Sequence, residues 1–190
     1  MANRILCFAG STRKDSFNKQ IARLMASNAN ELGAAATFID LSDYDMPLYN
    51  GDLEATSGLP ETAARLQALF ESHDGLLIAS PEYNGFFSPL LKNTMDWLSR
   101  PDPAREEKPT PYADKVAGIV AASPGGYGGL RGLVPLRQQL AALGVTVVGK
   151  QLAIASAYEK LDAEGNFTDQ HTSQQLKDVV SAVINCQIKT

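Results

Sequence analysis

The chain has 190 residues, 44% of them hydrophobic and 20% charged, a composition that favours one globular domain over residues 1–190. Its net charge of −4, without a basic tail, argues against nucleic-acid binding. Two cysteines exclude a disulfide scaffold and a cysteine-based metal cluster, and the first apolar run, residues 5–9, is too short for a membrane span. We therefore expect a cytoplasmic protein with no metal and no membrane span.

Short apolar runs alternate along the chain with segments of helical periodicity. The expected elements, in order, are a strand over 5–9, a helix over 17–32, a strand over 36–39, a helix over 63–70, a strand over 76–79, a helix over 90–98, a strand over 116–122, a helix over 133–143, a strand over 145–148 that can continue through 152–155, and a helix over 176–184. Strands that are apolar on both faces suit a parallel sheet covered by helices on each side. The alternation predicts an α/β fold with a doubly wound parallel sheet.

Two long loops interrupt this alternation. The first, residues 41–58, carries apolar groups that need cover, and we expect it to form a subunit interface or a lid over a ligand. Those groups are Tyr44, Met46, Pro47, Leu48 and Tyr49. The second loop, residues 101–114, is charged and proline-rich, and we expect it to be a solvated surface excursion.

The first predicted strand runs into a loop that suits a phosphate group. Gly10 permits a sharp turn, Arg13 is a fork-shaped cation, and the next helix presents its N-terminus. Short donors along the loop are Ser11, Thr12, Ser16 and Asn18. The pattern is neither a Walker A motif nor a GxGxxG fingerprint. A capped helix beside a solvated Arg-Lys pair would use the same residue types, so both interpretations stay open here.

Two further loops follow buried strands. Pro81-Glu82-Tyr83-Asn84-Gly85 offers polar and aromatic groups that suit a planar heterocycle, and it also fits a turn ending in an Asn-Gly pair. Ser123–Gly129 has four glycines around Tyr127, which lets backbone approach a flat ligand or simply makes a flexible loop. Because ligands bind beyond the carboxyl ends of parallel strands, three such loops at one edge favour a ligand site.

These three segments, with the run from Leu91 to Trp97, resemble the NAD(P)H-dependent FMN reductase family, the flavodoxin-like group that includes quinone, chromate and azo-dye reductases. The similarity runs from about Ile5 to Val148. It implies a flavodoxin-like three-layer α/β/α sandwich around a five-stranded parallel sheet of order 2-1-3-4-5. It also implies tightly held FMN, and a homodimer or homotetramer with the active site near the subunit interface. NADPH or NADH would donate hydride, and quinones or similar small oxidants (flavin, azo compounds, chromate) would accept it.

The resemblance also assigns residues. Those that would hold the FMN phosphate and ribityl chain are Ser11, Arg13, Ser16, Phe17 and Asn18. Those that would line the isoalloxazine are Pro81, Glu82, Tyr83, Asn84 and Gly85, with Ser123, Gly125 and Gly126 on its pyrimidine side. Asn93 and Trp97 are interpreted as structural, and no catalytic side chain is expected because flavin supplies the chemistry.

Two positions depart from the family pattern. Asp15 stands where relatives often carry glycine, and a carboxylate there would weaken phosphate binding slightly unless it points outward. Phe86 and Phe87 stand where relatives often have smaller or more polar residues, and we expect them to narrow the cleft above the flavin.

Two other functions fit parts of the sequence. Cys7 and Arg13 have the C-x5-R spacing of tyrosine phosphatases, and Asp102-Pro103 would mimic the general acid of the low-molecular-weight type. Cys7, however, lies inside an apolar run, which favours packing over nucleophilic chemistry. The other alternative is a non-enzymatic flavodoxin-type electron carrier, which Arg13 and the modest charge disfavour. Both histidines, His73 and His171, are expected at the surface.

Overall fold

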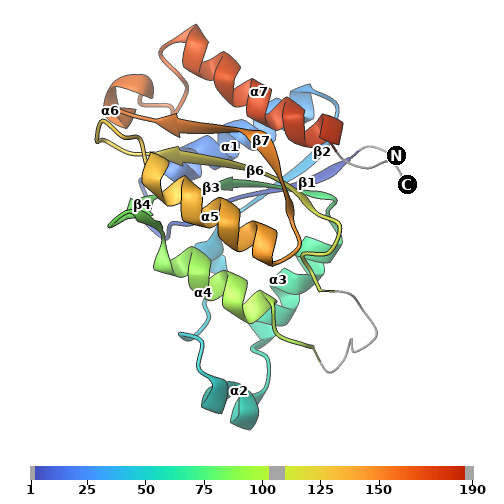
Figure 1. The fold of residues 1–190 in the computed structure, drawn as a ribbon. Coiled ribbons are helices and arrows are strands. Elements are labelled where there is room, and N and C mark those ends of the chain that lie inside the picture. The colour runs from blue at the N-terminus through green and yellow to red at the C-terminus, as the bar shows by residue number, and fades with distance from the viewer. Residues whose placement is uncertain (1–2, 103–109, 187–190) are drawn as a thin grey trace.

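The computed structural model describes residues 3–102 and 110–186, and its centre is a five-stranded sheet (Figure 1). All neighbours in the sheet are parallel, in the order β2-β1-β3-β6-β7. The strands are β1 (Arg4–Ala9), β2 (Ala35–Ile39), β3 (Gly75–Ala79), β6 (Val116–Ala122) and β7 (Thr146–Ile154). A two-stranded antiparallel hairpin, β4 (Glu82–Tyr83) and β5 (Phe86–Phe87), lies outside this sheet. Leaving the hairpin aside, the order is the predicted 2-1-3-4-5.

Helices cover both faces of the sheet (Figure 1). The helices are α1 (Phe17–Glu31), α2 (Gly51–Ser57), α3 (Glu61–Glu71), α4 (Pro89–Leu98), α5 (Leu130–Ala142), α6 (Ala157–Lys160) and α7 (Gln170–Cys186), with a 3-10 turn η1 (Leu41–Asp43). One core lies between the sheet and α1 and α7, and a second lies between the sheet and α3, α4 and α5. Since β1, β3 and β6 are buried on both faces, the predicted three-layer α/β/α sandwich is confirmed.

Helix boundaries follow local chemistry. Ser16 caps α1 and Ser88 caps α4, and each side chain accepts a backbone N–H from the first turn of its helix. Gly144, with φ of +88°, follows the C-cap Leu143 of α5 and ends the helix in a left-handed conformation that suits glycine. Among the described residues, no helix is both long and apolar enough to span a bilayer.

The carboxyl ends of three strands bring the predicted site loops together. The ladder continues one step past the strand ends, since Gly10 donates its N–H to Ala79 and Ser80 donates to Val120. Ser123 likewise donates to Ile154 of β7. The loops after β1, β3 and β6 therefore leave the sheet side by side, as expected for parallel strands.

Three expectations are wrong in detail. Residues 41–58 are not structureless, because they contain η1 and α2. The loop over 101–114 is only partly described, since 103–109 lie outside the described residues, and Tyr112 in it is buried and hydrogen-bonded to Met95 rather than solvated. His73 is also buried, because its ring bonds to Leu69, Ser72 and Thr37, whereas His171 is exposed as predicted.

Candidate FMN site

A cavity of about 110 Å³ opens where the loops after β1, β3 and β6 meet. The predicted site residues that line it are Ser11, Arg13, Ser16, Phe17, Asn18, Pro81, Glu82, Tyr83 and Ser123. Ala122 and Pro124 line it as well, although the sequence did not single them out. We call residues 11–18 the phosphate half of this site, and residues 81–85 with 123–127 the ring half.

The phosphate half combines buried polar side chains with an exposed stretch over residues 12–15. Ser11 and Ser16 are 4% and 5% exposed, and the Ser11 hydroxyl accepts the N–H of Arg13 at 3.3 Å. A Cβ on Gly10 would lie 2.8 Å from the Ser88 hydroxyl, so glycine lets the loop press against α4. Arg13 and Asp15 are exposed. Helix α1 starts directly after this loop, with no acidic residue in its first turn, so its N-terminus offers free N–H groups and a favourable dipole to an anion.

Asn18 differs from its neighbours because its amide is engaged within the protein. Its Nδ2 donates to the carbonyl of Ala122 at 2.9 Å, and its Oδ1 accepts the N–H of Ala122 at 3.0 Å. The side chain is 3% exposed. The amide therefore joins the start of α1 to the last residue of β6.

The loop after β3 is a tight hairpin. Asn84 and Gly85 have φ of +54° and +83° and form its two-residue turn, with Tyr83 paired to Phe86 across the strands. The interpretation of this segment as a turn thus holds for Asn84 and Gly85, and neither lines the cavity. Tyr83 does line it, and is 46% exposed.

The two phenylalanines of the hairpin have different environments. Phe87 is 2% exposed and packs in the core under α5, so the expectation that it narrows the cleft is wrong. Phe86 is half exposed and does not line the cavity, although it pairs with Tyr83 at its edge.

Glu82 ties the hairpin to α5. Its carboxylate accepts the Nε of Arg131 at 2.7 Å and the backbone N–H of Arg131 at 3.2 Å. The carboxylate also gains from the N-terminal dipole of α5. The Arg131 guanidinium lies 5.3 Å from the centre of the Tyr127 ring. Nothing in the local sequence links Glu82 to Arg131, because they are 49 residues apart.

The glycines of the 123–129 loop have two separate uses. Gly128 and Gly129 are left-handed, and a Cβ on them would lie 2.6 Å from the Ala155 nitrogen and the Ala121 Cβ respectively. Both are therefore required by packing. A Cβ on Gly125 would meet only the Ser123 hydroxyl, at 3.7 Å, and one on Gly126 would meet nothing within 4 Å. These two glycines leave open space beside the cavity.

Residues 46–58, which we call the arm, project beyond α4 with α2 at their tip (Figure 1). Two residues of α4 hold it: Asn93 and Trp97 both donate to the Pro47 carbonyl, at 2.9 Å and 2.7 Å. The Asn93 oxygen also accepts the N–H of Tyr49 at 2.7 Å. The structural interpretation of Asn93 and Trp97 fits these contacts. Leu48, between the two anchored residues, is 79% exposed.

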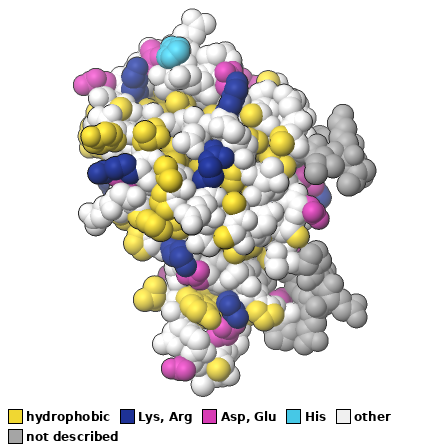
Figure 2. Space-filling model, viewed as in Figure 1, with side chains coloured by type: hydrophobic (Ala, Val, Ile, Leu, Met, Phe, Trp, Pro, Cys, Tyr) yellow, Lys and Arg dark blue, Asp and Glu magenta, His cyan; other side chains and the backbone are white. Residues whose placement is uncertain are grey.

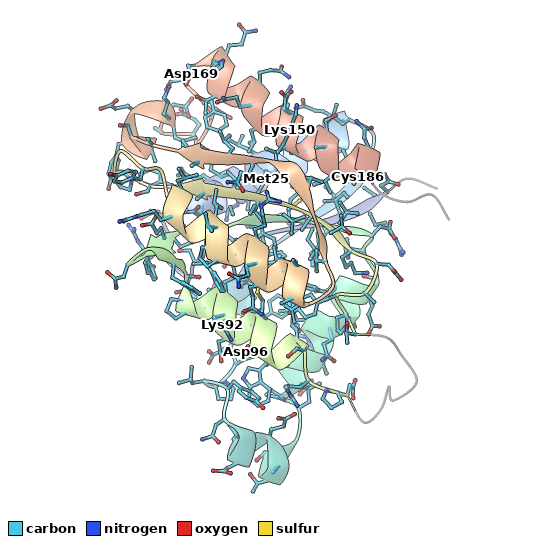
Figure 3. The ribbon with its side chains drawn as sticks, viewed as in Figure 1. Met25, Lys92, Asp96, Lys150, Asp169 and Cys186 are labelled. Atoms are coloured by element: carbon cyan, nitrogen blue, oxygen red, sulfur yellow. The ribbon has the colours of Figure 1, made fainter. Side chains whose placement is uncertain are left out.

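A second clamp joins the arm to the end of α4. Glu54 accepts hydrogen bonds from Arg100 and from the Tyr49 hydroxyl, at 2.9 Å and 2.8 Å. The bond from Arg100, with that from Tyr49, lowers the pKa of the Glu54 carboxyl. Nearby, Lys92 and Asp96 form an ion pair along α4, the helix that holds the arm (Figure 3).

The cysteines do not form a site. Cys7 is fully buried in β1, and burial raises the pKa of its thiol to about 12, so it is not the thiolate that a phosphatase needs. Pro103 of the proposed general-acid pair lies outside the described residues. Cys186 is exposed at the end of α7 (Figure 3). Within residues 3–102 and 110–186, no group of three or more His, Cys, Asp or Glu side chains is placed to hold a metal ion.

Comparison with known proteins places this geometry in context. Residues 3–159 match the family model described as NADPH-dependent FMN reductase. The chain is 36% identical over 182 residues to an NADPH:quinone oxidoreductase of Arabidopsis thaliana, covering 93% of this chain and 88% of the relative. It is 33% identical over 182 residues to an NAD(P)H-dependent FMN reductase of Pseudomonas aeruginosa, covering 95% and 92%. Among solved structures, the flavoenzyme NAD(P)H:(acceptor) oxidoreductase FerB of Paracoccus denitrificans superposes with a TM-score of 0.81 and 29% identity, covering 97% of this chain and 96% of FerB.

Proposed function

The chain belongs to the NADPH-dependent FMN reductase family, and from this premise we propose that its three converging loops hold FMN for the reduction of quinones by NAD(P)H. It is an oxidoreductase that uses FMN and NAD(P)H and acts on small-molecule oxidants. The observation that carries the proposal is the cavity, because residues from all three family motifs line it together. Its relatives are enzymes, so neither the phosphatase nor the non-enzymatic carrier is favoured.

The residues present fit the two ends of FMN. Buried serines, an exposed arginine and a helix N-terminus suit a phosphate. The open space beside Gly125 and Gly126 suits a flat ring. The cavity alone is smaller than the roughly 300 Å³ or more of most ligand pockets, so a bound flavin would extend beyond it over the ring half.

We assign the roles of the side chains accordingly. Ser11, Arg13 and Ser16 hold the phosphate with the first N–H groups of α1, and Phe17 packs beside the ribityl chain. Pro81, Tyr83 and Ser123, with the backbone of Gly125 and Gly126, line the ring. Glu82, Asn84 and Gly85 fix the shape of the hairpin rather than bind through their side chains.

When bound, FMN would supply the hydride chemistry between a nicotinamide and a quinone. The protein contributes orientation and exclusion of water. The half-exposed Tyr83 ring lies at the edge of the cavity, where it can pack against a planar donor or acceptor. No side chain is required to act as nucleophile or general base.

An absorbance spectrum tests the proposal directly. The purified protein is expected to be yellow, to bleach when NADPH or NADH is added without oxygen, and to regain its colour when a quinone follows. A colourless protein that FMN cannot reconstitute would contradict it.

We also propose that the chain assembles as a homodimer or homotetramer with the ring half near the interface. Exposed apolar side chains gather over the N-terminal end of α5 and the β4–β5 hairpin (Figure 2). They are Phe86, Tyr127, Leu130 and Val134. Light scattering after gel filtration should give two or four chain masses, and a monomer would contradict the proposal.

Two further assignments are proposals of the same kind. The chain works in the cytoplasm, which the two free cysteines support, since disulfides mark oxidising compartments. Residues 1–190 form a single domain, which the one sheet shared by both cores supports. A single cooperative unfolding transition with coincident spectroscopic probes tests the second assignment.

A further inference from the structure

Ala122 marks the point where two neighbouring strands part. The ladder between β3 and β6 reaches Val120, whose carbonyl accepts the N–H of Ser80. Residues two apart in a strand point their backbone groups to the same side, so the N–H and carbonyl of Ala122 also face β3. The chain turns away from the sheet there, because Pro81 follows Ser80 and hairpin β4–β5 comes next.

The Asn18 side chain makes the two hydrogen bonds to Ala122 that a further residue of β3 would make if the strand continued. Its amide meets both backbone groups of Ala122, at 2.9 Å and 3.0 Å, from a position 104 residues earlier in the chain. Only a carboxamide of this length offers one donor and one acceptor side by side, as a peptide group does. Aspartate would present acceptors to both groups, and leucine would present neither.

The 123–126 loop depends on this contact for its position. On the β7 side the backbone holds it, since Ser123 donates to Ile154 and accepts from Ala157. On the α1 side the described contact is the Asn18 amide. Ala122, Ser123 and Pro124 all line the cavity, so the contact sets the width of the site between its two halves.

Resting on the proposed FMN site, we propose that Asn18 is a positioning residue that fixes the ring half against the phosphate half. It acts through Ala122 rather than by binding the FMN phosphate. Removing the Asn18 amide moves the 122–126 backbone and weakens binding of the isoalloxazine ring. The loss should therefore be the same for a flavin with a phosphate and for one without. This differs from Arg13 and Ser16, which recognise the phosphate itself.

Comparing FMN with riboflavin separates the two roles, because riboflavin lacks the phosphate. Dissociation constants for both flavins are measured by fluorescence quenching on flavin-free Asn18→Leu, Arg13→Ala and Lys150→Ala proteins. Asn18→Leu should weaken both flavins by about tenfold or more and leave their ratio within twofold of wild type. Arg13→Ala should weaken FMN alone, and Lys150→Ala, at an exposed position that does not line the cavity, should change neither.

Two outcomes overturn the proposal. If Asn18→Leu lowers the preference for FMN as Arg13→Ala does, Asn18 binds the phosphate directly. If it leaves both affinities unchanged, the contact does not position the ring half. Should Asn18→Leu fail to fold, the smaller and uncharged Asn18→Ala replaces it, judged by the same ratio of the two affinities.

Hydrogen exchange tests the contact without any flavin. In flavin-free protein the Ala122 amide should exchange at least tenfold faster in Asn18→Leu than in wild type, whereas the control Lys150→Ala should keep the wild-type rate. An unchanged Ala122 rate in Asn18→Leu would sink the proposal. If wild-type protein binds neither flavin, the proposed function fails, and the exchange rate still decides whether Asn18 holds Ala122.

Discussion

The phosphate half and the ring half face the same cavity but are built in different ways. In the phosphate half, Ser11, Ser16 and Asn18 are 3–5% exposed, on the loop after β1 and in the first turn of α1, while residues 12–15 are exposed. In the ring half, Tyr83 and Tyr127 are 46% and 69% exposed, and Gly126 has open space beside it. Under the proposed function, the buried polar groups of the first half suit an anion, and the open space of the second suits a planar ring with a second planar molecule beside it.

Different contacts hold the two halves in place. A buried carboxamide, Asn18, joins the halves through backbone groups of Ala122. A rim ion pair, Glu82 with the largely exposed Arg131, joins the hairpin to α5. The Glu82 side chain is nearly buried while Arg131 is largely exposed, so solvent screens this pair more than it screens the enclosed Asn18 contact. The predictions below probe this difference, from the largest expected effect to the smallest.

Gly129→Ala should have the largest effect, a loss of folding stability, because it forces an alanine into the left-handed conformation and places its Cβ against Ala121. We expect a loss of about 2–4 kcal/mol in the free energy of unfolding, measured with urea. Gly144→Ala is the matched control, since Gly144 is also left-handed but has nothing within 4 Å, and it should lose only about 1–2 kcal/mol. Equal losses in the two variants would show that packing at Gly129 is not tight.

Arg13→Ala should weaken binding of the FMN phosphate and leave the ring half unchanged. Hydrogen bonds to a charged group are worth about 1.5–3 kcal/mol, which corresponds to about 10- to 150-fold weaker FMN binding. Unfolding of the flavin-free protein should be unchanged, because the side chain is exposed. Equilibrium dialysis against FMN measures the effect, and wild-type affinity in the variant would remove Arg13 from the site.

Gly126→Ala should weaken binding of the flavin ring and leave the phosphate half unchanged. The added methyl meets no protein atom within 4 Å, so the stability of the flavin-free protein should stay within about 0.5 kcal/mol. A flavin ring in that space would meet the methyl, and both FMN and riboflavin should bind about tenfold more weakly, a cost of about 1.4 kcal/mol. Gly51→Ala on the arm, equally free of neighbours, controls for the substitution itself. Unaltered flavin binding by Gly126→Ala would place the ring elsewhere.

Tyr83→Leu should have the smallest effect. The effect should be on the KM for a quinone rather than on the affinity for FMN. Loss of an aromatic contact costs about 0.5–1.5 kcal/mol, so KM for a quinone should rise about two- to tenfold while FMN binding stays near wild type. Steady-state kinetics with NADPH and a benzoquinone measure it. A large loss of FMN with unchanged KM would mean that Tyr83 serves the cofactor instead.

The sequence predicted the fold well because its signals are local. Apolar runs such as residues 5–9 and 116–122 cannot be solvated on either face, so they had to become central strands. Helix ends are also set locally, because the Ser16 cap bonds to Lys19 only three residues away and Gly144 needs only its own left-handed φ. The buried positions of Tyr112 and His73 were missed, because each is set by contacts with another element.

By itself, the sequence determined the doubly wound parallel sheet, the family motifs and the three loops that meet at one edge, since periodicity and strand direction fix these. Only the tertiary structure decided what each side chain in those loops does. Asn18 and Glu82 look like ligand-binding residues in a linear motif, yet their partners, Ala122 and Arg131, lie 104 and 49 residues away. A buried amide or carboxylate bonds to whatever polar group the fold brings beside it, and no local pattern records which group that is.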